Sequence, residues 1–276
     1  MDERQLEKCA VDSFGFKQRE FERLREEYFA YIDAFRESLR ARPSKARVMK
    51  LMGAHRCDVY IMKALENDHQ EGKVFDGYWR DLHLAFETRL MESLSIELPK
   101  MGREVFISAE APEDVGKLDL LLISNGHDPI TIRDCLMRKT IGVELKTGYS
   151  WSMEQVERYL WKVDSLILTR LATADAVVFR RQELMPFLTR SLSDKIAKVK
   201  RFLNGDLKPL PSNDCFECPI QNCQFNMTNQ GKGPEFILVK KEHFHKTPEL
   251  MNNLYIAIDR TIDLILEELD NCSRTK

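Results

Sequence analysis

Two apolar stretches decide the fold of this chain: Leu118-Asp119-Leu120-Leu121-Leu122 and Ile141-Gly142-Val143-Glu144-Leu145-Lys146. Both have the length and composition of strands, and each carries charged residues among apolar ones. A charge buried in a strand is costly unless it is paired or binds a metal ion. Residues two apart in a strand project from the same face, so Glu144 and Lys146 point together. Asp119 joins them if the two strands are neighbours.

Asp119, Glu144 and Lys146 would then form a candidate metal site. Two carboxylates supply the hard oxygen ligands that Mg²⁺ prefers, and the lysine ammonium would orient an attacking water or offset charge on a phosphorane. A Glu-x-Lys triplet alone is weak evidence, because Glu71-Gly72-Lys73 also satisfies it within a polar stretch. An ordinary buried ion pair at the edge of a sheet explains the three residues equally well.

The surrounding sequence predicts an α/β fold, with strands in the middle and helices before and after them. Helices are expected over 14–42, 44–51, 58–66, 75–97, 152–172, 183–204 and 249–269, and strands over 103–109, 117–123, 129–135, 140–146, 176–179 and 235–239. We expect a helical N-terminal cap over 1–100, a core over 101–210, and a cysteine loop with a C-terminal helix over 211–276. The three regions are expected to form one integrated domain.

Composition and charge place only broad limits on the function and location of the protein. The 276 residues carry a formal net charge of -2 and have a pI near 6.3, so no overall cationic field draws the chain onto nucleic acid. This balance disfavours a passive DNA-coating protein and says little about an enzyme with a local cleft. No apolar run approaches the roughly 18 residues of a membrane span, and the charged N-terminus is unlike a signal peptide. A cytoplasmic protein without membrane contact is therefore expected.

Further polar residues follow a recognisable order along the chain. Gln155 and Tyr159 lie four apart on the expected helix after the Glu-x-Lys strand, and therefore share one helix face. His83 lies on the helix before the sheet with Glu87 one turn on, although a single histidine is most often an ordinary satisfied side chain. The complete order resembles the PD-(D/E)xK nuclease superfamily, and more narrowly its RecB-like branch: His83, Asp119, Val-Glu144-Leu-Lys146-Thr, Gln155-x-x-x-Tyr159.

The resemblance implies a restriction-endonuclease-like mixed sheet flanked by helices. It also implies a role for each matching residue: His83, Asp119 and Glu144 as ligands of Mg²⁺ or Mn²⁺, Lys146 as the catalytic lysine, and Gln155 and Tyr159 as catalytic-site residues that contact DNA or organise the site. Two departures are visible. Leu118 stands where the family name has proline, and the long link from Asp119 to Glu144 suggests a hairpin extension around 124–140.

Three of the seven cysteines are crowded into one loop: Cys215, Cys218 and Cys223. An odd number of cysteines in an expected cytosolic protein does not indicate a disulfide framework. Three thiolates from one loop are most of a tetrahedral sulfur site, and Cys57 is the candidate fourth ligand. A zinc site that takes Cys57, His55 or Cys135 as its fourth ligand, or a set of free thiols, is the alternative.

One early and three late cysteines resemble the iron–sulfur members of the RecB-like branch. These include the CRISPR-associated spacer-acquisition exonucleases of the fourth Cas family and nuclease subunits of bacterial break-repair complexes. The resemblance implies a 4Fe–4S cluster on Cys57, Cys215, Cys218 and Cys223. The spacing from Cys218 to Cys223 is slightly short for the family pattern, which leaves the type of cluster open.

Basic and aromatic residues offer candidate nucleic-acid contacts. Four cations of the helix over 183–204 could bind backbone phosphates: Lys195, Lys198, Lys200 and Arg201. A solvated helix face explains them equally well. Trp151 and Trp161 flank the Gln-x-x-x-Tyr segment and could stack bases, but core packing explains Trp161 better.

These observations predict a deoxyribonuclease that depends on a divalent metal ion, with exonuclease or end-processing activity on single strands or duplex ends. Repair, phage defence and CRISPR adaptation are the expected settings, with a protein partner from one of them. The alternative is a catalytically inactive nucleic-acid-binding or assembly subunit that keeps the fold, and structured RNA is a third possible substrate. The intact set of Asp119, Glu144 and Lys146 favours the enzyme.

Overall fold

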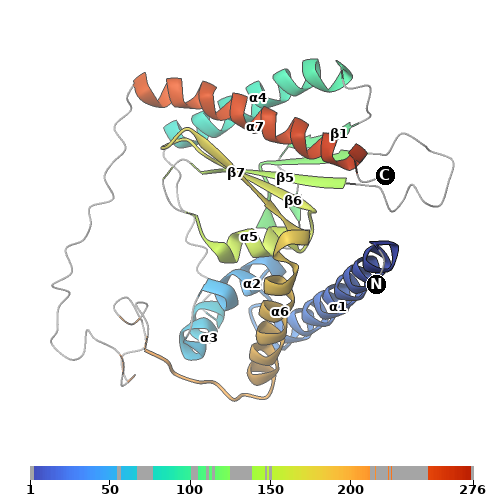
Figure 1. Cartoon of the computed structure of the whole chain (residues 1–276). Coiled ribbons are helices and arrows are strands. Elements are labelled where there is room, and N and C mark those ends of the chain that lie inside the picture. The colour runs from blue at the N-terminus through green and yellow to red at the C-terminus, as the bar shows by residue number, and fades with distance from the viewer. Residues whose placement is uncertain are drawn as a thin grey trace. The chain divides into compact units, whose positions relative to one another are not determined.

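The structure is a computed structural model (Figure 1), and it describes residues 3–54, 57–66, 77–100, 105–109, 112–113, 116–124, 139–146, 148, 151–211, 215, 223, 225 and 248–274. The chain forms two compact units, each built from two separate segments. The helical unit contains Met1–Glu71 and Met185–Phe244, and the sheet unit contains Gly72–Leu184 and His245–Lys276. The units therefore do not follow the regions expected to end at residues 100 and 210.

A five-stranded mixed sheet forms the centre of the sheet unit, in the order β1-β4-β5-β6-β7. The strands are β1 (Val105–Ala109), β4 (Leu120–Ser124), β5 (Lys139–Lys146), β6 (Ser165–Arg170) and β7 (Asp175–Arg180), and β2 (Pro112–Glu113) pairs with β3 (Gly116–Lys117) in a separate ribbon. All neighbours in the sheet are antiparallel except β5 and β6, which are parallel. The expected α/β class is confirmed. The condition for bringing Asp119 to Glu144 is also met, because β4, which begins one residue after Asp119, pairs with β5.

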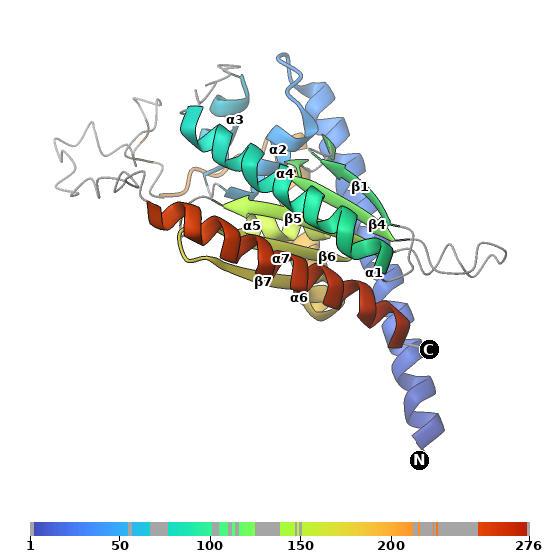
Figure 2. The same ribbon diagram turned by 90° about the horizontal axis from the view of Figure 1, so that it is seen from above.

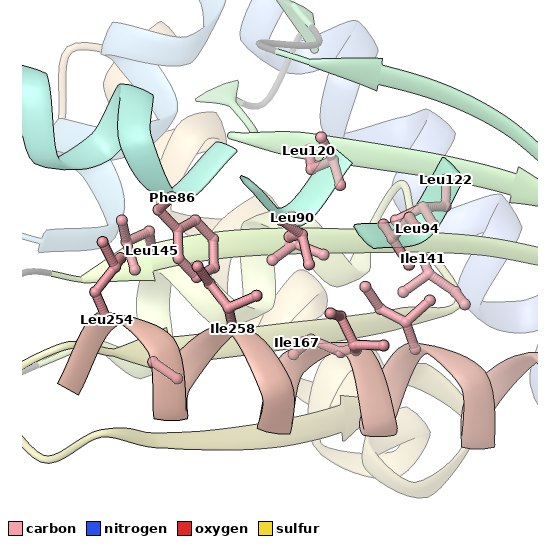
Figure 3. Packing of buried hydrophobic residues seen from close by; sticks show 14 of the residues in the cluster. Phe86, Leu90, Leu94, Leu120, Leu122, Ile141, Leu145, Ile167, Leu254 and Ile258 are labelled. Carbon is pink, nitrogen blue, oxygen red and sulfur yellow. The ribbon is translucent and has the colours of Figure 1, made fainter. Parts of the chain in front are cut away.

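Two long helices, α4 (Gly77–Lys100) and α7 (Pro248–Arg274), cover one face of this sheet and pack against each other (Figures 1 and 2). Apolar side chains three or four apart on each helix meet the alternating residues of the strands. Figure 3 shows this core, which includes Phe86, Leu90, Leu94, Leu120, Leu122, Ile141, Leu145, Ile167, Leu254 and Ile258. The shorter helix α5 (Met153–Leu160) lies on the opposite side of the sheet (Figure 1).

The helix expected over 152–172 is wrong in its second half. Helix α5 ends at Leu160, and Ser165–Arg170 forms β6 in parallel register with β5. Helix α5 and the strand β6 follow each other closely, and β6 is buried on both faces. Their apolar residues together therefore had the spacing of one long helix. A short apolar run does not distinguish a buried strand from a helix, and here the parallel pairing with β5 decides.

The helical unit contains α1 (Glu3–Ser38), α2 (Lys45–Ala54), α3 (Asp58–Glu66) and α6 (Arg181–Leu203), which begins in the sheet unit. Phe21, Leu24, Tyr28 and Phe35 lie on the buried side of α1, and Phe35 packs edge-on against Phe202 of α6 with ring centroids 5.4 Å apart. Phe16 of the same helix is 63% exposed. Among the described helices, none combines the length and apolar character that a membrane crossing needs. The strands expected over 129–135 and 235–239 lie outside the described residues.

Candidate active site

The pairing of β4 with β5 brings the two expected carboxylates together. Leu120 lies opposite Val143 in the antiparallel register, so Asp119, one residue before β4, comes opposite Glu144. Its Oδ2 accepts a hydrogen bond of 2.6 Å from the backbone N–H of Leu145. The Asp119 carboxylate thus takes the place of a backbone acceptor at the end of the ladder, which fixes it beside β5.

Glu144 is nearly enclosed by protein, with a side chain only 8% exposed. Its Oε1 accepts hydrogen bonds from Lys146 Nζ at 2.5 Å and from Gln155 Nε2 at 2.7 Å. Its Oε2 is buried and has no hydrogen-bond partner among the residues that the structure describes. A buried carboxylate oxygen of this kind is costly unless it gains a ligand.

Helix α5 supplies the next two expected residues. Ser152 caps the helix, since its Oγ accepts a hydrogen bond of 3.2 Å from the backbone N–H of Gln155. Gln155 and Tyr159 follow on one face, and the amide of Gln155 also donates to the Tyr159 hydroxyl at 3.3 Å. That hydroxyl donates in turn to the backbone oxygen of Lys117 at 2.7 Å. The chain of contacts holds Gln155 in the orientation that reaches Glu144.

Helix α4 adds His83 and Glu87, which lie one turn apart. Nδ1 of His83 is 3.9 Å from Oδ1 of Asp119. Ligand atoms of His83, Glu87 and Asp119 all lie within 4.8 Å of one another. The sequence places Glu87 one turn after His83, and this shared helix face was the available signal for Glu87, for which no role was predicted. Glu144, expected to share the metal with His83 and Asp119, is not in this group of three.

Burial and neighbouring charge change the acidity of three site residues. Burial, and then the charge of Asp119, raise the pKa of Glu144 above its ordinary value, although Lys146 opposes the shift. Burial lowers the pKa of His83, which keeps its imidazole neutral and able to act as a ligand at neutral pH. Burial and the charge of Glu144 raise the pKa of Tyr159, so its hydroxyl stays a donor.

The donor set suits a divalent cation. Carboxylate oxygens favour Mg²⁺ and Mn²⁺, and a neutral imidazole is a common nitrogen ligand of Mn²⁺ and later transition metals. Burial and the charge of Asp119 raise the pKa of Glu144, and a bound cation would stabilise the charged form of this carboxylate. The residues present therefore fit a bound Mg²⁺ or Mn²⁺ ion.

No family model, curated protein or solved structure matches this chain. The interpretation of the site therefore depends on its own geometry and on the order of its residues. All six expected residues of the sheet unit lie in this one region: His83, Asp119, Glu144, Lys146, Gln155 and Tyr159.

The expected cysteine ligands belong to the helical unit. Cys57 and Cys215 are buried, Cys223 is partly buried, and none of the three is in a disulfide bond. Cys218 lies outside the described residues, as do the alternative zinc ligands His55 and Cys135. The three described thiols are not gathered within 4.8 Å of one another. A metal centre on these cysteines therefore stays a prediction.

Each of the four cations expected to bind phosphate has a contact inside the helical unit. Lys198 donates to the backbone oxygen of Met52 at 2.8 Å, and burial lowers its pKa to about 8. Arg201 donates to the fully buried Asp58 at 3.1 Å. The remaining two contacts join Lys195 to Ser191 and Lys200 to Glu27. The contacts of Lys198 and Arg201 give these two residues structural roles, and phosphate binding by the four cations stays a prediction.

The two tryptophans beside α5 pack against protein. Trp161 is fully buried, as core packing predicted. The ring of Trp151 meets that of Phe179 edge-on, with centroids 5.0 Å apart. Trp151 remains partly exposed beside the site helix, and base stacking on it stays a prediction.

Proposed function

We propose that this protein is a nuclease that hydrolyses phosphodiester bonds of DNA with the help of Mg²⁺ or Mn²⁺. The proposal rests on one observation: Asp119, Glu144 and Lys146 converge at the end of two paired strands, where Glu144 keeps a buried oxygen without a hydrogen-bond partner among the described residues. An ordinary structural ion pair would need only Glu144 and Lys146. It would not need Asp119, whose charge opposes ionisation of Glu144. The ordered resemblance to the PD-(D/E)xK superfamily supports the same function.

We also propose that the sheet unit has a restriction-endonuclease-like core. The elements α4, β1, β4, β5, α5 and β6 follow one another around the site, apart from the small β2–β3 ribbon. The sheet is antiparallel as far as β5 and parallel from β5 to β6. This mixed sheet with flanking helices supports a restriction-endonuclease-like core, in which the carboxylates sit on β5 and next to β4.

His83, Asp119 and Glu144 would hold the metal ion through one nitrogen and two carboxylates. A bound Mg²⁺ or Mn²⁺ supplies Lewis-acid polarisation of a phosphoryl oxygen and lowers the pKa of water. Lys146 holds Oε1 of Glu144 and keeps a positive charge beside the place where negative charge grows on the phosphate. Gln155 fixes the same oxygen, and Tyr159 fixes Gln155.

Removal of the metal ion tests the proposal. We expect purified protein to cleave end-labelled DNA with Mg²⁺ or Mn²⁺ and to stop when a chelator is added. Single-stranded DNA, duplex DNA and structured RNA are assayed together, so that the substrate class is measured and not assumed. Absence of cleavage of all three substrates with either ion would leave the alternative, a catalytically inactive nucleic-acid-binding or assembly subunit.

The cysteines of the helical unit carry a second part of the proposal, an iron–sulfur cluster on Cys57, Cys215, Cys218 and Cys223. Protein purified without oxygen is expected to contain about four iron and four sulfide per chain. Cys57→Ser should lower that content, while Cys9→Ser, which changes a cysteine outside the predicted set, should not. A colourless protein with one zinc per chain would contradict the iron–sulfur cluster and support the zinc site.

A further inference from the structure

Glu87 lies on the same face of α4 as His83, the residue expected to bind metal. Leu82 and Phe86 anchor this part of the helix in the core, which leaves the adjoining face with His83 and Glu87 toward Asp119. The three side chains bring ligand atoms within 4.8 Å of one another from two different elements. Metal–oxygen bonds of about 2.1 Å would place neighbouring ligand atoms about 3 Å apart, so these side chains would move slightly closer together around a single ion.

Glu144 provides an independent reason to expect a cation beside this group. Its buried Oε2 has no hydrogen-bond partner among the described residues, and its charge acts on both His83 and Asp119. Lys146 binds Oε1 of this carboxylate and leaves Oε2 without a donor among the described residues. A divalent ion would provide the ligand that this oxygen lacks.

We propose that Glu87 is a ligand of the divalent cation, which it binds together with His83 and Asp119. This inference rests on the proposed metal-dependent function and adds a ligand that the family resemblance does not assign. Helix α4 then supplies two of the ligands from one turn, and its packing in the core sets their position. A nitrogen donor among carboxylates should favour Mn²⁺ over Mg²⁺, because imidazole binds transition metals more readily than it binds Mg²⁺.

Titration with Mn²⁺ tests this role, with the unbound ion measured by electron paramagnetic resonance. Glu87→Gln and Glu87→Met should each weaken Mn²⁺ binding about 10- to 100-fold, as expected for loss of a group that supports a metal site. Glu92→Gln is the matched control, since it removes an exposed carboxylate from the same helix and should leave the affinity unchanged. Melting curves without metal check that both Glu87 variants keep the fold.

The outcomes separate this inference from the proposed function. If the wild type binds Mn²⁺ and cleaves DNA, but both Glu87 variants bind the ion as tightly as the wild type does, Glu87 is not a ligand and the nuclease proposal stands. Loss of the fold in both variants without metal would assign Glu87 a structural role and also overturn the inference. If the wild type neither binds the ion nor cleaves DNA, both proposals fail.

Discussion

Replacement of Lys146 by glutamine should slow DNA cleavage by about 10²- to 10⁴-fold, the usual contribution of a positioned catalytic group. Lys146 Nζ lies 2.5 Å from Glu144 Oε1, on the strand that carries the buried carboxylate. Glutamine keeps much of the length and can still donate a hydrogen bond, but it removes the positive charge. The loss should therefore appear in the rate of the chemical step.

Metal binding distinguishes this catalytic role from a structural one. Removal of a cation beside the carboxylates should leave Mn²⁺ affinity equal to or greater than that of the wild type. Lys100→Gln serves as the control, because that lysine is 62% exposed at the end of α4. A Lys146→Gln variant that cleaves DNA as fast as the wild type would remove Lys146 from the mechanism. A variant that has lost Mn²⁺ binding would make its role structural.

Replacement of Glu268 by alanine should lower the free energy of unfolding by about 3–5 kcal/mol, as expected when one partner of a buried ion pair is removed. The Glu268 side chain, on α7, is 1% exposed and accepts hydrogen bonds from three donors of the sheet. They are Lys139 Nζ at 2.8 Å, Ser165 Oγ at 2.5 Å and Arg180 Nε at 2.6 Å. Alanine leaves two cations without this carboxylate, beneath the helix that covers the core.

The neighbouring Glu267 provides a matched control for this variant. Its side chain is 59% exposed and lies 4.0 Å from Arg180, so Glu267→Ala should change stability little. Urea unfolding of both variants and the wild type measures the difference. Equal stability of the two variants would contradict a supporting role for the buried Glu268 network.

The Glu268 contribution should also depend on pH in a defined direction. Burial alone would raise the pKa of Glu268, but hydrogen bonds from Lys139, Ser165 and Arg180 outweigh it and lower the pKa. A lowered pKa in the folded state gives stability that is present above the ordinary value of 4.5 and is lost as pH falls through the folded value. The stability gap between wild type and Glu268→Ala should therefore narrow in acid.

The sequence predicted most of the residues that the structure brings together in the candidate site. Asp119, Glu144 and Lys146 stood out because charges within apolar strands need partners, and the antiparallel register of β4 and β5 then brought them together. Helical spacing predicted that Gln155 and Tyr159 share one face, and the family resemblance implied that this face belongs to the site. The helix expected as far as residue 172 failed because apolar spacing does not reveal the parallel pairing that makes 165–170 a strand.

Other features depend on residues far apart in the chain. Glu268 has its partners on β5, β6 and β7, and its position in the final helix gave no sign of burial among polar groups. Lys198 and Arg201 looked like a basic patch, but their contacts with Met52 and Asp58 come from helices more than a hundred residues earlier. The charge pattern of α6 alone therefore did not predict that Lys198 and Arg201 bind acceptors on other helices.

The most direct test of the proposed nuclease is the cleavage rate of end-labelled DNA by wild type and Asp119→Asn, measured together with saturating Mn²⁺. Asparagine keeps the size of the side chain and an oxygen that can accept from the Leu145 N–H, but it removes one negative charge from the site. We expect rapid cleavage by the wild type and a rate lower by at least about a hundredfold for the variant. Equal rates for the two proteins, or cleavage by neither, would contradict a metal-dependent nuclease site at Asp119, Glu144 and Lys146.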